Sequence, residues 1–340
     1  MSYEFLQILW FILIAVLWIG FFFLEGFDFG VGMLLPFLGK KDLERRAIIN
    51  TVGPTWDGNE VWLLTAGGAT FAAFPHWYAT MFSGFYLALF LLLVGLIIRG
   101  ISFEYRSKDA SPKWRHTFDW MIAVGSFLAA LLLGAAFANL ARGVPIDGKM
   151  MFTGNLFTLL NPYGLLGGVT TVAVFLLHGA NFLGLKLEGE LKERAHKTAK
   201  TLWIVASVLY VALGVFTYVA GFWARGFVNP GIVPIAAVVV LLASGYFINN
   251  NRHGWAFIMV ALNIVLTQVT FFSMTFPNVM LSTLNPEWSL TIYNASSSEY
   301  TLTVMSVVAL IFVPIVLVYQ GWSYWMFRKR ISADKKSLVY

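Results

Sequence analysis

Four carboxylates among the first 60 residues lie within or beside apolar runs. Glu25 and Asp28 are three residues apart, and so are Asp57 and Glu60. On a helix this spacing places both members of a pair on one face. Placing an ionised carboxylate in hydrocarbon costs at least about 2.5 kcal/mol of free energy. A membrane helix that contains such a group therefore points it into the bundle, pairs it with a cation or keeps it protonated. Coupled buried carboxyls can take up and release protons near neutral pH. We interpret these four residues as a proton-uptake route.

Two further charged residues stand at the borders of apolar runs. Arg99 ends one run and Asp119 begins another. Arg99 is the only cation near the four acids, so at most some of them pair with it. Alone, Arg99 and Asp119 are each more typical of a topology signal or a contact with lipid headgroups, and they gain a functional interpretation only together with the four acids. A location of Glu25 and Asp28 at the membrane interface, where water reaches the helix end, also remains open.

Histidine is the other residue type that could carry redox or metal chemistry. Only His178 lies within an apolar run, while His76, His116, His196 and His253 fall in turns and polar segments. A single membrane histidine is more often hydrogen-bonded between helices than bound to iron. A haem with two histidine ligands would need a second histidine within an apolar run, and the sequence has none. Ligation of haem iron by one histidine and one methionine remains open. The chain has no cysteine, which excludes thiolate metal sites.

The composition identifies the environment of these groups. Hydrophobic residues make up 59% of the 340 residues and charged residues 12%, whereas soluble domains are about 45–50% apolar and about 25% charged. A soluble enzyme and a nucleic-acid-binding protein are therefore excluded as leading interpretations. The net charge of +6 comes from short basic clusters between apolar runs, a pattern typical of membrane topology.

Nine segments are apolar and long enough to cross a bilayer, which takes about 20 residues. Breaks at Pro75 and at Asn161-Pro162 divide two longer runs, because proline and turn residues interrupt helices. The first segment continues as a helix to Leu38. The predicted spans are Phe5–Leu24, Val52–Phe74, Trp77–Ile98, Trp120–Ala141, Leu165–Leu185, Thr201–Ala224, Ile232–Asn249, Gly254–Phe276 and Thr301–Phe327.

The basic residues predict the orientation of these spans. With the N-terminus outside, all of the 23 Lys and Arg residues except Arg142, Lys149 and Arg225 fall on the inner side. An error in the span count would scramble this alternation. We therefore expect an all-α polytopic protein with nine transmembrane helices, N-out and C-in. It forms a single integral-membrane domain over residues 1–340, with residues 328–340 as a short cytoplasmic tail.

Several motifs resemble subunit II of the cytochrome bd quinol oxidases. The similarity runs nearly end to end and is dense. Its main segments are Gly26–Met33, Glu44–Arg46, Trp56–Leu63, Leu160–Leu166 and Tyr319–Trp325.

The resemblance implies a subunit of a terminal respiratory oxidase in the bacterial cytoplasmic membrane, which oxidises quinol and reduces oxygen to water. The implied fold is two four-helix bundles plus one peripheral helix. Subunit I is expected to carry the quinol site, haem b and haem d. No cofactor or metal is assigned to this chain. A small single-helix accessory subunit and lipid or quinone are further implied partners, and nucleic acid is not one.

The resemblance also implies roles for individual residues. The acid of its Trp-Asp-Gly-Asn motif, linked to proton uptake, corresponds to Asp57. Asp28, Arg99 and Asp119 correspond to residues linked to an intact haem centre. Glu60 departs from relatives that carry an amide, which leaves open whether the second carboxyl is needed.

Two other functions remain open from the residues alone. A proton-coupled secondary transporter would also use buried acids and glycine-rich helices, although it would favour an inverted repeat and helices broken at the membrane midplane. A haem-bearing membrane reductase subunit would require His178 or His76 to bind iron.

Overall fold

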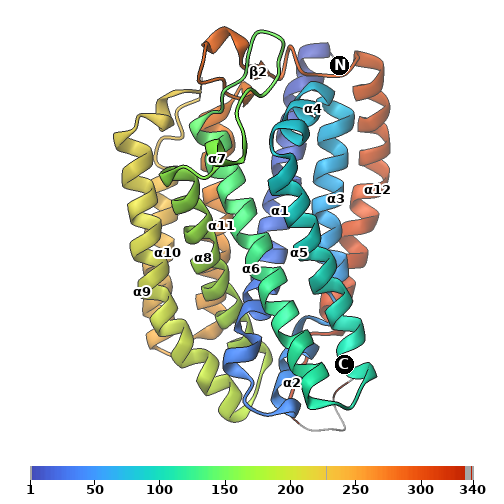
Figure 1. Cartoon of the computed structure of the whole chain (residues 1–340), viewed down its shortest axis with the longest axis vertical. Helices are drawn as coiled ribbons and strands as arrows, with labels where there is room; N and C mark the ends of the chain where they lie inside the picture. Colours follow the sequence, from blue (N-terminus) through green and yellow to red (C-terminus); the bar gives the residue numbers. More distant parts are fainter. Residues whose placement is uncertain (1, 227, 334–337, 339–340) are drawn as a thin grey trace.

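The computed structural model describes residues 2–226, 228–333 and 338. Long helices run side by side between the two ends of the molecule (Figure 1). Of the predicted tail, residues 334–337, 339 and 340 lie outside the described residues. The helices are α1 (Tyr3–Leu38), α2 (Asp42–Val52), α3 (Trp56–Ala73), α4 (Pro75–Gly84), α5 (Tyr86–Tyr105), α6 (Pro112–Arg142), α7 (Leu156–Leu159), α8 (Pro162–Lys186), α9 (Gly189–Val219), α10 (Val233–Asn249), α11 (His253–Thr275) and α12 (Glu299–Met326).

Within the described residues, seven helices are long and apolar enough to cross a membrane, namely α1, α5 continued by the 3₁₀ turn η1 (Arg106–Lys108), α6, α8, α9, α11 and α12. Helix α10 is apolar but has 17 residues. Helix α3 has 18 residues and is not among the seven. Its first turns carry Asp57, Asn59 and Glu60, which lower its hydropathy.

The predicted third span differs from the structure. The break at Phe74-Pro75 is present, but Trp77–Ile98 is not one helix, because α4 ends at Gly84 and α5 begins at Tyr86. A Cβ on Gly84 would lie 2.6 Å from the Phe152 side chain, so α4 packs closely against the loop between α6 and α7.

Several helices begin earlier than hydropathy predicts. Helix α6 begins at Pro112, where Ser111 accepts a hydrogen bond from the Trp114 N–H, and α9 begins at Gly189. These first turns are polar, so they extend a membrane helix beyond its apolar part. The continuation of α1 to Leu38 is confirmed.

Helix α1 lies at the centre and packs against α3, α6, α8 and α11. Helices α8 to α11 pack against one another on one side of it, and α5 packs on α6. The contact between α1 and α8 is close, because a Cβ on Gly30 would lie 1.9 Å from the Phe175 carbonyl oxygen. Small residues permit such approaches in membrane bundles.

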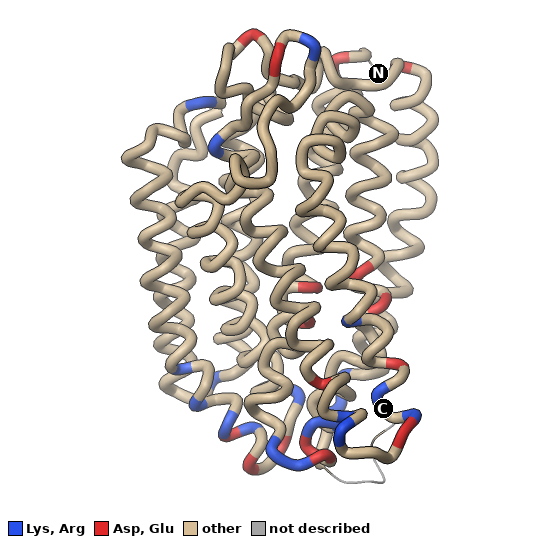
Figure 2. Tube along the Cα trace, in the orientation of Figure 1, with Lys and Arg blue, Asp and Glu red and all other residues tan. Residues whose placement is uncertain are grey.

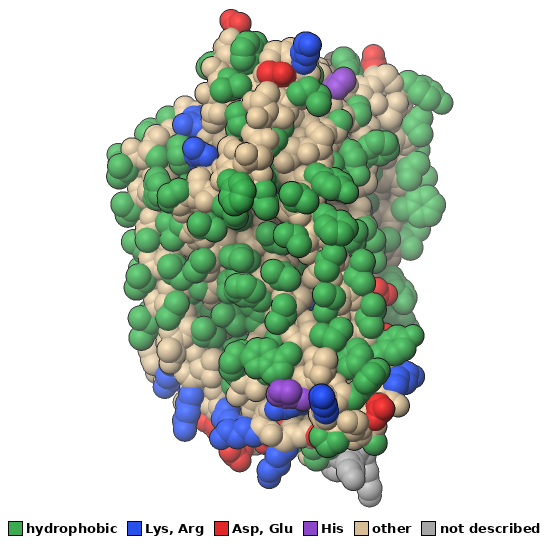
Figure 3. All heavy atoms as spheres, viewed as in Figure 1, with side chains coloured by type: hydrophobic (Ala, Val, Ile, Leu, Met, Phe, Trp, Pro, Cys, Tyr) green, Lys and Arg blue, Asp and Glu red, His purple; other side chains and the backbone are tan. Residues whose placement is uncertain are grey.

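The two ends of the molecule differ in charge. Most Lys and Arg positions gather at the end where the chain terminates, and a small charged group lies inside the bundle above it (Figure 2). We call the end of the molecule where most Lys and Arg positions gather the basic rim. A band of hydrophobic side chains separates the two ends (Figure 3).

The opposite end is capped by loops. They include the 3₁₀ turns η2 (Phe222–Ala224) and η3 (Pro286–Trp288) and a two-stranded antiparallel hairpin of β1 (Asn278–Met280) and β2 (Leu290–Thr291). This hairpin is the exception to the predicted all-α fold.

Candidate functional site

The charged group inside the bundle begins with Glu25 and Asp28. Both lie on one face of α1, and both side chains are fully buried. Neither is at the helix end, because α1 continues for ten residues beyond Asp28. Both residues thus lie inside the helix bundle and not at the end of α1.

Arg99 on α5 is the counter-ion of this group. Its Nη2 lies 3.2 Å from Glu25 Oε2, and its Nη1 lies 2.8 Å from Glu60 Oε2. The guanidinium also lies 4.9 Å from the ring centre of Phe29 and 5.2 Å from that of Phe103, within cation–π range. We call Glu25, Asp28, Glu60 and Arg99 the acid cluster.

Arg99 lies inside α5 and not at the end of this helix. Its side chain is fully buried, six residues before the end of α5. The sequence prediction placed it at the membrane edge because the predicted span ended one residue earlier. A buried guanidinium requires a compensating charge, and two carboxylates supply it.

Asp57 and Glu60 have different environments. Because α3 begins at Trp56, Asp57 lies in the first turn and is exposed, rather than two turns deep as its place in the predicted span suggested. The Glu60 side chain is 22% exposed and faces Arg99. The structure thus brings Glu60 into the acid cluster and leaves Asp57 on the surface of this chain.

Asn59 is a part of the site that the sequence analysis missed. It is fully buried, and its Nδ2 donates to Asp28 Oδ2 at 2.7 Å. Its Oδ1 accepts from Tyr324 on α12 at 2.7 Å. The position of Asn59 between Asp57 and Glu60 in the sequence was the signal that could have identified it as a site residue.

Asp119 belongs to a second ionic group, at the basic rim. It is fully buried and pairs with Arg45 at 2.9 Å and with Arg106 at 2.5 Å. Arg106 also pairs with Asp42, which contacts Arg115. Because α6 begins at Pro112, Asp119 lies two turns inside it and faces α2 and η1. Asp119 is therefore an ion-pair partner of Arg45 and Arg106, and its partners are different from those of Arg99.

A third ionic group, separate from the two described above, connects α2 to α9. Glu44 pairs with Arg194 and also accepts hydrogen bonds from the backbone N–H groups of Lys40 and Lys41. Burial alone raises the pKa of Glu44, but the hydrogen bonds from Arg194 and the two backbone groups lower it below its ordinary value.

Comparison with known proteins identifies the family. Residues 6–327 match the sequence profile described as cytochrome bd terminal oxidase subunit II. The chain belongs to this family.

Relatives of subunit II match nearly the whole chain. The chain is 44% identical to cytochrome bd ubiquinol oxidase subunit 2 of Bacillus subtilis over 336 residues, with 98% of each chain covered. It is 41% identical to cytochrome bd-I ubiquinol oxidase subunit 2 of Escherichia coli K12, covering 98% of this chain and 97% of the relative.

A solved structure has the same fold. A chain of the bd oxidase from Geobacillus thermodenitrificans superimposes with a TM-score of 0.76 at 15% identity, covering 95% of this chain and 99% of the other. This subunit II is thus a component of a respiratory oxidoreductase complex and a multi-pass protein of the bacterial cytoplasmic membrane. The family favours the oxidase over the transporter.

The two histidines that could bind a haem iron lie in different environments. His178 is fully buried, its ring stacks on Phe257 at 4.5 Å, and its Nε2 lies 3.3 Å from the Phe23 carbonyl oxygen. His76 is exposed at the loop-capped end. Among the described residues no group of three or more His, Cys, Asp or Glu is arranged to hold a metal ion.

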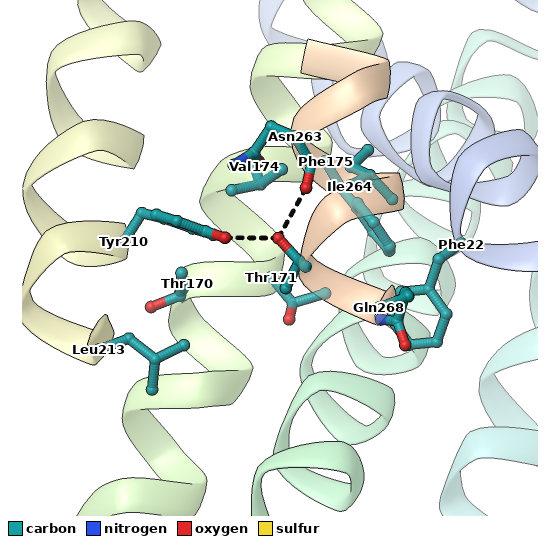
Figure 4. Close-up of a pocket in the computed structure, with 11 residues that line it drawn as sticks. Phe22, Thr170, Thr171, Val174, Phe175, Tyr210, Leu213, Asn263, Ile264 and Gln268 are labelled. Atoms are coloured by element: carbon teal, nitrogen blue, oxygen red, sulfur yellow. Dashed lines mark hydrogen bonds between the residues drawn. The ribbon is translucent and has the colours of Figure 1, made fainter. Parts of the chain in front are cut away.

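A separate, mostly apolar cavity of about 50 Å³ lies between α1, α8, α9 and α11 (Figure 4). Tyr210 and Thr267 are hydrogen-bonded at 2.5 Å, and Thr267 donates to the Asn263 carbonyl oxygen. None of the described lining residues is charged. The cavity is large enough for water and is not part of the acid cluster.

Proposed function

We propose that this chain supports the haem-bearing subunit I of a cytochrome bd-type terminal quinol oxidase and contributes a cytoplasmic proton-uptake route. The names of its relatives, which are ubiquinol oxidase subunits, support quinol as the electron donor. The haems of subunit I, haem b and haem d, would supply the redox chemistry. The observation that carries the proton route is the acid cluster, which is buried beside the basic rim and reaches the surface at Glu60.

The topology that we propose has nine crossings, with the N-terminus outside and the basic rim in the cytoplasm. Helices α1, α3, α5 and α6 form one four-helix group, and α8 to α11 form the other. Helix α12 is peripheral. The contacts around α1 and the gathering of basic residues at one end support this arrangement. We retain one domain over residues 1–340, with 328–340 as its tail.

The exposed face of α3 is the surface that we propose for subunit I. Asp57 is exposed there, and a Cβ on Gly58, Gly67 or Gly68 would meet nothing within 4 Å in this chain. Lipid does not solvate a carboxylate, whereas a partner helix with a polar side chain would both pair with Asp57 and use the room at the glycines. We also propose a small single-helix accessory subunit as a further partner.

Protons would approach from the basic rim through Asp57 and reach Glu60, and then the buried Glu25 and Asp28. Arg99 contacts both Glu60 and Glu25. When a proton neutralises one of these carboxylates, Arg99 is therefore attracted more strongly to the other carboxylate. Asp28, Arg99 and Asp119 would in addition hold the helices that face the haem centre. The reaction then takes its protons from the cytoplasm.

Purification through a tag on this chain tests the proposal. Native membranes are solubilised in mild detergent, and a reduced-minus-oxidised visible spectrum of the product is recorded. We expect haem bands to accompany a larger co-purifying subunit, and the same bands in His178→Ala. A colourless chain from membranes whose solubilised extract retains intact oxidase would contradict the assignment.

A further inference from the structure

Helix α12 has little apolar contact with the rest of the chain. Leu302 is its only buried residue within the described part of the chain, and the helix as a whole contacts α1 and α3. Because neighbouring lipid is as apolar as a helix surface, burial holds such a helix weakly and hydrogen bonds weigh more. Polar contacts therefore determine where the end of α12 near the basic rim lies.

Those contacts form a chain of three consecutive hydrogen bonds that leads from Trp62 to Asp28. The Trp62 Nε1 donates to Gln320 Oε1 at 2.9 Å, and Gln320 Nε2 donates to Asn59 Oδ1 at 3.3 Å. Asn59 Nδ2 then donates to Asp28 Oδ2 at 2.7 Å. Tyr324 also donates to Asn59 Oδ1.

The direction of this chain is set at its outer end. An indole N–H can only donate, so Gln320 must turn its oxygen toward Trp62 and its nitrogen toward Asn59. Asn59 must then turn its oxygen toward Gln320 and its nitrogen toward Asp28. The orientation of the buried Asn59 amide is thus favoured from both sides, by the indole N–H two hydrogen bonds away and by the ionised Asp28 carboxylate, which can only accept.

We propose that Trp62, Gln320 and Asn59 form a directed hydrogen-bond chain, and that Asn59 is the positioning residue that holds the Asp28 carboxylate. The inference deepens the proposed proton route and rests on it for its effect on activity. Among the described residues, the Asn59 donor is the hydrogen-bond partner of Asp28, whose Oδ1 has none. The position of α12 thereby sets the proton affinity of an acid on α1.

Glu25, Glu60, Arg99 and Tyr324 are the other ionisable groups that face Asp28. None of them is altered when Trp62 is changed. Loss of the amide donor disfavours the ionised carboxylate of Asp28. The pH profile of quinol-dependent oxygen consumption should therefore move to higher pH.

The test compares matched variants of the purified oxidase complex. We expect Trp62→Phe, Tyr324→Phe and Asn59→Ala to displace the profile upward, Asn59→Ala by about one pH unit. Trp322→Phe and Tyr319→Phe make the same chemical changes at exposed positions of α12 and should leave it unmoved. A purely structural effect would lower the rate without moving the profile.

Two outcomes separate the hypotheses. If Asp28→Asn changes the profile but Trp62→Phe and Asn59→Ala do not, the hydrogen-bond chain is overturned and the proton route stands. If Asp28→Asn leaves rate and profile unchanged, Asp28 is not part of the proposed route, and the inferred role of Asn59 in turnover fails with it.

Discussion

At the scale of residues, one buried cation controls the environment of the proposed site. Arg99 is shared by Glu25 and Glu60, and the desolvation of all three groups is offset only while the pairs are intact. The sequence identified the acids and Arg99 as a set. It could not give their depth, because depth depends on where each helix begins.

Arg99→Ala should leave two buried carboxylates without their counter-ion. We expect a loss of about 3–5 kcal/mol in the free energy of unfolding, and a lower haem content of the purified complex. Thermal unfolding and the haem spectrum measure the two effects. Arg115→Ala removes a pair whose side chains are 31% and 42% exposed, and should cost at most about 1 kcal/mol. Equal losses in the two variants would contradict the account of Arg99.

Glu44 predicts a pH effect on the attachment of α2. Since its pKa in the folded protein lies below the ordinary 4.5, its contribution to stability is present above pH 4.5 and is lost as the pH falls through the folded value. Thermal unfolding followed from pH 6 down to about pH 3.5 should show less acid-dependent loss in Glu44→Gln than in the native chain. Glu104→Gln, at an exposed side chain of α5, is the control. An unchanged acid dependence in Glu44→Gln would remove the ion pair from the account.

At the scale of elements, the apolar centres of the helices were predictable and their ends were not. Hydropathy located the apolar middle of α6 and α9 but missed the polar first turns that place Asp119 and Arg194. It also joined α4 to α5, because nothing in that run is polar enough to signal the break after Gly84. Asn59 was missed because an amide gives no charge signal, although it connects α12 to α1.

The close contact of α1 with α8 gives a prediction at this scale. In Gly30→Ala the new Cβ would lie 1.9 Å from a backbone oxygen, so the two helices must separate. We expect a cost of roughly 1–3 kcal/mol or more, measured by thermal unfolding of the complex. Gly214→Ala on α9 meets nothing within 4 Å and should gain up to about 1 kcal/mol from helix propensity. A neutral Gly30→Ala would show that the two helices are not packed as described.

At the scale of the whole molecule, the distribution of charge and the family agree with one interpretation. Basic residues gather at one end, the acid cluster lies just inside that end, and the exposed Asp57 lies on the proposed subunit I face of α3. On the proposed route, a partner subunit would cover the carboxylate at which protons are expected to enter. The sequence could not define the partner-facing surface, because an exposed residue such as Asp57 has the same sequence signal whether it faces lipid, water or another subunit.

Oxygen consumption per haem in the complex that carries Asp57→Asn tests the central claim most directly. Haem content is read from the reduced-minus-oxidised spectrum of the same sample, and Glu104→Gln, an exposed acid near the same rim, is the control. The account predicts full haem content and turnover lowered by at least about tenfold, as expected for the loss of a proton-transfer group. Native turnover at full haem content would contradict a proton route through this subunit at Asp57.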